Sequence, residues 1–307
     1  MERWAGKVAV ITGASCGMGK LLCEELVKAG MIVIGLGRDT KTIQKHADEL
    51  KKEKGKLIPK AVDFCPLKND GSLYPDAKKY NHQDIKEVFE FIDKTYGAVH
   101  ILCNMASQGT SPCLLEDEIG MWKYTVEINI IGPAVLCKYA IANMRKHNVK
   151  GHIINVGGTA SYYTSIFMDC HFYSVTKFIL RAMGDGLRME FRANNIPIRV
   201  SHIGPGHVLT GAQDRGESKT SEVYEGFLEF AKIYGMKRST FPRRLPIDAT
   251  GDKVYTSGLL PALQAQNVID QILGMIAADD GAEVMDVIMK PTDRKHTVLE
   301  TDLYWRP

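Results

Sequence analysis

Tyr173 and Lys177 are four positions apart in a segment with helical spacing, residues 172–191, so their side chains are expected on one helix face. An unperturbed phenol has a pKa of about 10 and is a poor base at neutral pH. A neighbouring ammonium group favours the phenolate, which lets a tyrosine exchange a proton with an alcohol or carbonyl oxygen. A tyrosine and a lysine with equal spacing also occur in the polar stretch 74–78, so the spacing alone is not specific. Tyr173 is the stronger candidate because an apolar, strand-like run, residues 153–156, precedes its helix.

A glycine-rich loop follows the first apolar run of the chain and precedes a segment with a helical apolar stripe. The loop, Gly13 to Gly19, has the spacing G-x-x-x-G-x-G, and Gly30 is placed to end the following helix. Free amides at a helix N-terminus stabilise a pyrophosphate, and glycines let the backbone approach it closely. The position at a first strand-to-helix turn favours a dinucleotide site over a simple tight turn. The predicted cofactor-binding residues here are Gly13, Ser15, Cys16, Gly17, Met18 and Gly19.

The end of the second apolar run is expected to meet the adenosine ribose. An acidic residue there would bind both ribose hydroxyls of NAD, whereas an arginine pairs with the 2′-phosphate of NADP. Arg38 therefore predicts NADP(H) in preference to NAD(H). Asp39 follows directly, and a shift of one residue in the turn would reverse this preference. Asp63, after the third predicted strand, is placed either to contact adenine or to cap a turn or helix.

Short runs rich in β-branched residues alternate along the chain with longer segments of helical spacing. This alternation predicts a parallel sheet covered by helices, and continuous apolar runs suit strands that are buried on both faces. The predicted fold is α/β, a Rossmann-type doubly wound parallel sheet in a single domain spanning residues 1–307. The strand-like runs are Val8 to Thr12, Ile32 to Leu36, His100 to Asn104, His152 to Val156, Ile198 to Ile203 and Val284 to Met289.

Two stretches interrupt the alternation. Residues 64–82 are polar and rich in turn formers, which predicts a surface insertion. Residues 211–260 form an expanded region in which Tyr224, Phe227, Leu228 and further apolar residues share one helical face. That face suits either a helix packed on the core or a lid over an apolar substrate.

Composition excludes several classes of protein. The net charge is +3, with 39 basic and 36 acidic residues, which is too small a surplus for a nucleic-acid surface or a polybasic membrane anchor. The seven cysteines are scattered, with no C-x-x-C pair for a zinc or redox site, so no metal is expected. The sequence shows neither a signal peptide nor a transmembrane run, and we expect a cytoplasmic protein.

Four motifs in this order resemble the short-chain dehydrogenase/reductase family. They are the glycine loop Gly13/Gly17/Gly19, Asn129 in Glu127 to Gly132, the pair Tyr173-x-x-x-Lys177, and the segment Gly204 to Thr210. The resemblance spans residues 5–210 and 260–295. The segments around Trp4 and His171 are similar to the farnesol dehydrogenase-like branch, which also holds dehydrogenase/reductase member 11.

The resemblance implies NADP(H) and alcohol or carbonyl chemistry on apolar substrates. It implies Tyr173 as the acid/base, Lys177 at the nicotinamide ribose and Asn129 ordering a water that relays protons to Lys177. It also places Asn104 on the adenosine side and Val208 and Thr210 at the carboxamide. Dimers or tetramers formed through the two helices that hold Asn129 and Tyr173 are common in the family, so a homodimer or homotetramer is expected.

The sequence departs from the family around the substrate. The family's serine, which donates a hydrogen bond to the substrate oxygen, is replaced by Gly158. Loss of such a donor costs about 10²- to 10³-fold in rate. Thr159 is one residue away and Ser161 three, and either hydroxyl would restore the donor after a small change in loop path. The family's N-N-A-G is altered to Asn104-Met105-Ala106-Ser107, and Gly204 replaces a serine.

Three functions remain open. The first is an NADP(H)-dependent oxidoreductase that interconverts an alcohol and a carbonyl on a small apolar substrate such as a terpenoid, retinoid or steroid, with Tyr173, Lys177, Asn129 and Thr159 as catalytic residues. The second is a weak or inactive NADP(H)-binding protein, a sensor or scaffold, because of Gly158. The third is a nucleotide-binding α/β protein with other chemistry, such as epimerisation.

Overall fold

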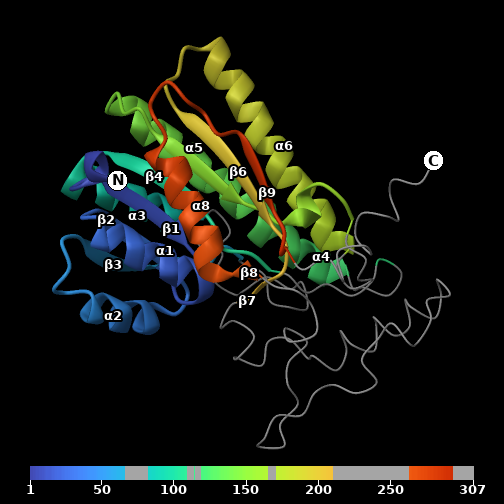
Figure 1. Cartoon of the computed structure of the whole chain (residues 1–307), viewed down its shortest axis with the longest axis horizontal. Helices are drawn as coiled ribbons and strands as arrows, with labels where there is room; N and C mark the ends of the chain where they lie inside the picture. Colours follow the sequence, from blue (N-terminus) through green and yellow to red (C-terminus); the bar gives the residue numbers. More distant parts are fainter. Residues whose placement is uncertain (66–81, 109–113, 115–118, 165–170, 210–262, 293–307) are drawn as a thin grey trace, which may run out of the picture.

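The computed structural model describes residues 1–65, 82–108, 114, 119–164, 171–209 and 263–292. Seven parallel strands form one sheet in the order β3-β2-β1-β4-β5-β6-β9 (Figure 1). The strands are β1 (Val8–Thr12), β2 (Ile32–Gly37), β3 (Lys56–Ala61), β4 (Val99–Asn104), β5 (His152–Val156), β6 (Arg199–Pro205) and β9 (Asp286–Met289). A parallel pair, β7 (Val208–Leu209) and β8 (Leu263–Gln264), lies beside the sheet. The strand order reverses direction between β1 and β4, which is where this fold binds dinucleotides.

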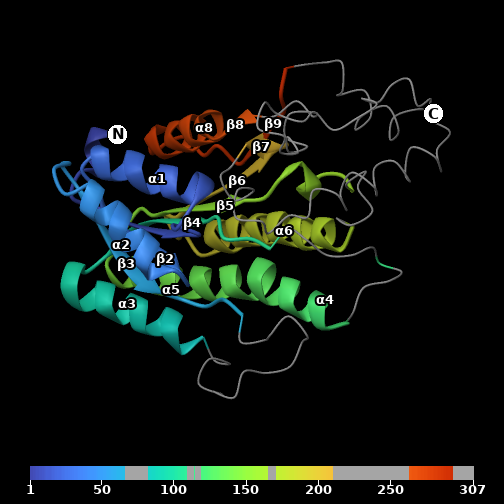
Figure 2. The same ribbon diagram turned by 90° about the horizontal axis from the view of Figure 1, so that it is seen from below.

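Helices cover both faces of the sheet (Figure 2). One apolar core joins the sheet to α1 (Gly17–Lys28), α2 (Thr40–Glu49) and α8 (Ala265–Ala277). The other joins it to α3 (Gln83–Tyr96), α5 (Gly132–Lys146) and α6 (His171–Ala193). The α4 helix (Ile119–Val126) continues through the π-helical turn η3 (Glu127–Ile131) into α5, and short 3₁₀ turns occur at η1 (Glu2–Trp4) and η4 (Thr159–Ser161). The predicted Rossmann-type sheet is confirmed.

The central strands are buried on both faces because an apolar core lies on each side of the sheet. All five residues of β1 are buried, as are all five of β5. The α1 helix ends where the sequence predicts: Gly30 has a φ of +88°, and the amides of Gly30 and Met31 donate to the carbonyls of Val27 and Leu26. These two nested hydrogen bonds form a Schellman motif, which ends a helix at a glycine with positive φ.

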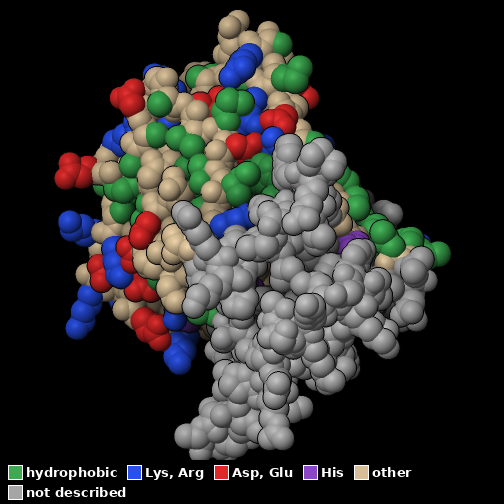
Figure 3. Space-filling model, turned by 45° about the vertical axis from the view of Figure 1, so that its right-hand side comes forward, with side chains coloured by type: hydrophobic (Ala, Val, Ile, Leu, Met, Phe, Trp, Pro, Cys, Tyr) green, Lys and Arg blue, Asp and Glu red, His purple; other side chains and the backbone are tan. Residues whose placement is uncertain are grey.

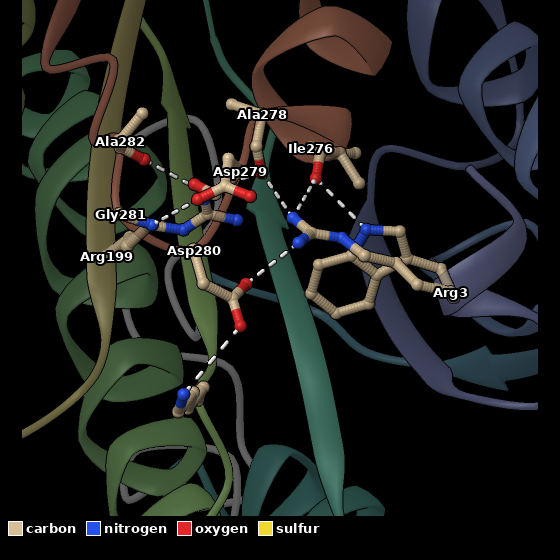
Figure 4. A network of polar contacts seen from close by, with 10 residues as sticks. Arg3, Arg199, Ile276, Ala278, Asp279, Asp280, Gly281 and Ala282 are labelled. Carbon is tan, nitrogen blue, oxygen red and sulfur yellow. Dashed lines mark hydrogen bonds and ion pairs between the residues drawn. The ribbon is translucent and has the colours of Figure 1, made fainter.

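Arginine side chains fasten the loop between α8 and β9 to the rest of the domain (Figure 4). Arg199 donates to the carbonyls of Ala278, Asp279 and Ala282 at 3.0 to 3.1 Å. Arg3 bridges to Asp280 at 2.9 Å and also donates to Ala278. The loop is therefore held in place by the N-terminal segment and by β6, which sets the position of the last strand, β9.

Several element boundaries differ from those predicted. The strand predicted at Ile198 to Ile203 begins at Arg199 and extends to Pro205, and the one predicted at Val284 to Met289 begins only at Asp286. The α6 helix begins one residue earlier and ends two residues later than the predicted 172–191. Most of the predicted polar insertion at 64–82 and all of the predicted lid at 211–260 lie outside the described residues. Within the described residues, Ile119–Lys146 has the length and hydropathy of a membrane span. Its residues Leu136, Ala140 and Met144 are buried in the core under the sheet, as in a core helix.

Candidate active site

The glycine loop between β1 and α1 forms a cradle with little room for side chains. Gly13 and Gly17 have φ values of +69° and +53°, which favour glycine. A β-carbon at Gly19 would lie 2.2 Å from the carbonyl oxygen of Gly13, so a side chain there is excluded. Cys16 occupies the N-cap of α1 and makes no side-chain capping bond. The first amides of α1 thus remain available to an anion, which fits a pyrophosphate.

The loop after β4 is held against this cradle by Thr12. The amides of Met105 and Ala106 both donate to the Thr12 hydroxyl at 2.8 Å. A β-carbon at Gly13 would lie 3.3 Å from Ala106, so the two loops are in close contact. The altered Asn104-Met105-Ala106-Ser107 segment therefore keeps a tight connection to the phosphate loop.

The two candidate residues for the adenosine ribose, at the end of β2, make different contacts. The Asp39 carboxylate caps α2, since it accepts from the Thr42 amide at 3.0 Å and from the Thr42 hydroxyl at 2.6 Å. The exposed Arg38 guanidinium reaches the Tyr124 hydroxyl at 3.5 Å. The Asp63 carboxylate accepts from the Cys65 amide at 3.2 Å, a local turn bond. Asp39 is thus engaged in local structure, while Arg38 extends from the strand end.

Tyr173 and Lys177 lie in the first two turns of α6. The Lys177 ammonium is 5.4 Å from the centroid of the Tyr173 ring and donates to the Val156 carbonyl at 3.3 Å. The lysine is 1% exposed, and this burial lowers its pKa from 10.5 to about 8. Desolvation disfavours the ammonium form, so the charge on Lys177 is sensitive to its neighbours at physiological pH. The structure brings the two predicted residues together at the carboxyl end of β5.

Asn129 lies in the π-helical turn η3, a feature that often marks functional sites. Its amide group donates to the Gln108 carbonyl at 2.9 Å and to the Thr176 hydroxyl at 3.0 Å. Its carbonyl accepts from the Gln108 amide at 2.8 Å. The Asn129 side chain therefore fastens the end of β4 to α6 next to Lys177.

Two adjacent glycines at the end of β5 have different surroundings. A β-carbon at Gly157 would lie 2.3 Å from the Ser161 hydroxyl oxygen and 2.4 Å from Nε2 of His202, so no side chain fits. Among the described residues, a β-carbon at Gly158 would meet nothing closer than 3.6 Å and would lie 3.8 Å from the Tyr173 hydroxyl. The space beside the Tyr173 hydroxyl is therefore left open by Gly158.

The two candidate hydroxyls differ in exposure. Ser161 is fully buried, whereas Thr159, at the start of η4, is partly exposed. Gly204 leaves room for the Tyr162 ring, since a β-carbon there would lie 2.5 Å from it. Of the two side chains, that of Thr159 is the more exposed.

The remaining predicted cofactor residues lie in different places. The Asn104 side chain is 2% exposed and donates to Asn155 at 2.9 Å and to the Cys137 sulfur at 3.4 Å, so it faces the sheet interior. Val208 is partly buried in β7, and Thr210 lies outside the described residues. Sequence reasoning missed His202, whose only signal was a histidine within the predicted strand Ile198 to Ile203. Within the described residues, no group of three His, Cys, Asp or Glu side chains is placed to hold a metal ion.

A doubly wound sheet, a glycine cradle at its switch point and a Tyr/Lys pair at the carboxyl end of β5 are together typical of nucleotide-binding oxidoreductases of Rossmann type. The short chain dehydrogenase family profile matches residues 7–220, and the chain belongs to that family.

Relatives and solved structures agree with this assignment. Human dehydrogenase/reductase SDR family member 11 is 31% identical over 232 residues, which is 73% of this chain and 84% of the relative. Farnesol dehydrogenase from Aedes aegypti is 32% identical over 211 residues, 68% of this chain and 80% of the relative. A metagenomic short-chain oxidoreductase in complex with NADP superposes with a TM-score of 0.66 at 19% identity, covering 94% of this chain and 98% of that one. A Burkholderia phymatum family member in complex with NAD has a TM-score of 0.69 at 19% identity, covering 98% and 93%.

Proposed function

We propose that this chain is an NADP(H)-dependent oxidoreductase that interconverts an alcohol and a carbonyl on a small apolar substrate. The observation that carries the proposal is the buried Lys177 ammonium beside the ring of Tyr173, whose hydroxyl lies 3.8 Å from the position of a β-carbon at Gly158. In that space a carbonyl oxygen would meet the Tyr173 hydroxyl. The nicotinamide cofactor supplies the hydride that is accepted by the carbonyl carbon.

Each residue has a separate role in this proposal. Tyr173 gives its hydroxyl proton to the substrate oxygen during reduction and takes it back during oxidation. The Lys177 ammonium stabilises the resulting phenolate by its charge and binds the nicotinamide ribose. Asn129 keeps η3 and α6 in place through Gln108 and Thr176, and we assign to it the ordering of the water that passes protons to Lys177.

We assign the missing hydrogen bond at the substrate oxygen to Thr159. It directly follows Gly158 and is partly exposed, while the Ser161 side chain is enclosed in the protein. The carboxamide end of the cofactor is assigned to Val208 and Thr210. The phosphate cradle is assigned to Gly13, Ser15, Cys16, Gly17, Met18 and Gly19, with Asp63 and the Asn104 backbone beside the adenosine.

The proposed preference for NADP(H) over NAD(H) rests on the different roles of Arg38 and Asp39. Asp39 is occupied at the N-cap of α2 by two bonds to Thr42. The Arg38 guanidinium carries the charge that a 2′-phosphate needs, and it extends from the end of β2. One solved relative holds NADP, and another holds NAD.

The apolar substrate class draws on the farnesol dehydrogenase of Aedes aegypti and on the apolar residues within 211–260. We also propose a cytoplasmic homodimer or homotetramer. Its contact surface would include the exposed apolar side chains of α6, namely Val175, Phe178, Ile179 and Met189. Basic and acidic side chains stand side by side on the face in Figure 3, an arrangement unlike the one-sided basic patch of a nucleic-acid surface.

Single-turnover oxidation of NADPH, followed with farnesal, retinal, steroid ketones and quinones as substrates, tests this function. Tyr173→Phe is the matched control because it removes only the hydroxyl. We expect at least one carbonyl to be reduced by the wild type and not by Tyr173→Phe. NADPH binding without any reduction above that control would instead favour the second candidate, a cofactor-binding sensor or scaffold, which the absent side chain at Gly158 supports.

A further inference from the structure

A row of polar side chains crosses four strands behind the candidate active site. Asn104, Asn155, His202 and Asp286 are register partners in β4, β5, β6 and β9. Residues in register on neighbouring strands point to the same face of a sheet. Asn104, Asn155 and His202 are at most 2% exposed. Buried polar groups of this kind need hydrogen-bond partners.

The α6 helix covers this row with three cationic side chains. Lys177, Arg181 and Arg188 are spaced at i, i+4 and i+11, so they share one face of α6. Arg181 donates to the Asp286 carboxylate at 2.9 Å, and the Tyr162 hydroxyl donates to the same carboxylate. His202 therefore lies among three cations, the carboxylate of Asp286 on β9 and the Tyr162 phenol from the end of η4.

Several atoms around His202 have no hydrogen-bond partner among the described residues. They are both ring nitrogens of His202, the Ser161 hydroxyl and the Asn155 side-chain nitrogen. The His202 ring and the Ser161 hydroxyl converge on Gly157, where a β-carbon would lie 2.4 and 2.3 Å from them. The residue before Gly157 is Val156, whose carbonyl accepts from the Lys177 ammonium. Buried groups of this kind are commonly satisfied by an ordered water.

The charges favour a neutral imidazole. Burial lowers the pKa of His202 to about 4, and Lys177, Arg181 and Arg188 act in the same direction, while Asp286 opposes them. A neutral imidazole has one donor and one acceptor nitrogen, whereas a protonated ring has no acceptor. A buried ammonium such as that of Lys177 has three hydrogen-bond donors and needs acceptors for them.

We propose that His202 is a positioning residue for Lys177, and that its neutral imidazole, with the Ser161 hydroxyl, holds a buried water that accepts a hydrogen bond from the Lys177 ammonium and so stabilises its charged form. The inference rests on the proposed function only where the Lys177 charge is said to stabilise the Tyr173 phenolate. Hydrogen bonding to a charged group favours the charged state. Loss of His202 therefore lowers the pH at which Lys177 loses its proton.

Nuclear magnetic resonance of the cofactor-free protein tests this directly. The chain is labelled with ¹³C at the lysine ε-carbons and with ¹⁵N in histidine, and Lys177→Met and His202→Gln assign the two resonances. We expect the His202 ring to remain neutral from about pH 5 to 9, which includes the range in which an ordinary histidine titrates. A His202 ring that gains a proton above about pH 6 overturns the proposal.

Variants separate the proposed link from simple packing. His202→Leu is expected to lower the titration midpoint of Lys177 by about half a pH unit or more, a roughly threefold change in proton affinity. His202→Gln keeps a donor and an acceptor and is expected to leave the midpoint near the wild-type value. Ser161→Ala is expected to shift the midpoint downward by a smaller amount. Because it removes only one oxygen atom, it replaces His202→Leu in the test if that variant does not fold.

Equal midpoints in wild type, His202→Leu and Ser161→Ala overturn the proposal, as do equal shifts in His202→Leu and His202→Gln. Because these readouts need neither cofactor nor turnover, they are independent of the enzyme assignment. A wild-type protein that shows the expected titrations but does not bind NADPH would refute the proposed function and leave the His202 inference standing.

Discussion

A β-carbon at Gly158 would lie 3.8 Å from the hydroxyl oxygen of Tyr173. Residue 158 is therefore next to the proposed proton donor, and its φ and ψ of 171° and 172° are extended values that any residue adopts. The position would accommodate a serine without strain. The position that the family resemblance assigns to a serine therefore has room for that side chain among the described residues.

This geometry predicts the behaviour of Thr159 and Gly158 together. Thr159→Val keeps the shape of the side chain and removes the hydroxyl, and we expect kcat to fall by about 10²-fold. Adding Gly158→Ser to Thr159→Val should restore most of the rate, whereas adding Gly158→Ala should not. Steady-state carbonyl reduction with NADPH measures all three. An unchanged kcat in Thr159→Val would remove Thr159 from the site.

The two neighbouring glycines should differ in their effect on stability. Gly157→Ala places a methyl group against Ser161 and His202, and overpacking of this kind costs about 1–3 kcal/mol. Gly158→Ala meets only ordinary contacts and is expected within about 0.5 kcal/mol of the wild type. Urea unfolding of the two variants gives the comparison. Equal free energies of unfolding would contradict the described packing around Gly157.

Arg38 should decide between the two nicotinamide cofactors. Arg38→Gln removes a charge-assisted pairing, so NADPH affinity should fall by roughly 10- to 100-fold while NADH affinity stays unchanged. Asp39→Ala is the control, because it removes the α2 cap and about 1 kcal/mol of stability without touching a 2′-phosphate. Fluorescence titration with both cofactors provides the ratio. A ratio that changes in Asp39→Ala and not in Arg38→Gln would reverse the assignment.

Lys177 should make stability depend on pH. Burial lowers its pKa from 10.5 to about 8, so in this interval the folded protein binds fewer protons than the unfolded chain. The contribution of Lys177 to stability therefore rises with pH across this interval, and below pH 8 the buried ammonium destabilises the fold by about 3 kcal/mol.

Replacing the ammonium tests this sign. Lys177→Met should be inactive and yet more stable than the wild type at pH 7 by about 1–3 kcal/mol, and the difference should shrink at pH 10. Lys177→Arg is the control, since a guanidinium keeps its charge at both values. Urea unfolding at each pH measures the difference. A Lys177→Met protein less stable than the wild type at pH 7 would show that burial of the ammonium is fully compensated.

The exposed apolar face of α6 predicts self-association. Phe178 is 40% exposed, and Val175 and Ile179 lie beside it with similar exposure. Phe178→Glu should convert the oligomer to monomers, because a carboxylate in an apolar contact is not solvated. Thr95→Glu on α3 adds the same charge away from this face and should leave the oligomer intact. Light scattering coupled to size exclusion distinguishes the two, and a monomeric wild type would refute the expected interface.

The sequence by itself determined the sheet-and-helix alternation, the glycine cradle and the Tyr173/Lys177 pair. These features depend on residues close together in the chain, where strand period, helix period and glycine backbone freedom act locally. For the same reason Gly30 was identified as the end of α1 without a structure. The glycine at position 158 could also be recognised from the sequence, because it is a single residue in a local motif.

Only the tertiary structure distinguished the contacts of residues that are adjacent in the sequence. Asp39 is the N-cap of α2, and the Asn104 side chain donates to Asn155 on the neighbouring strand. The contrast between Gly157 and Gly158 depends on residues from β6 and α6, far along the chain. The row that contains His202 exists because four parallel strands align in register under one helix, and such register is set by packing between distant segments, which no local pattern encodes.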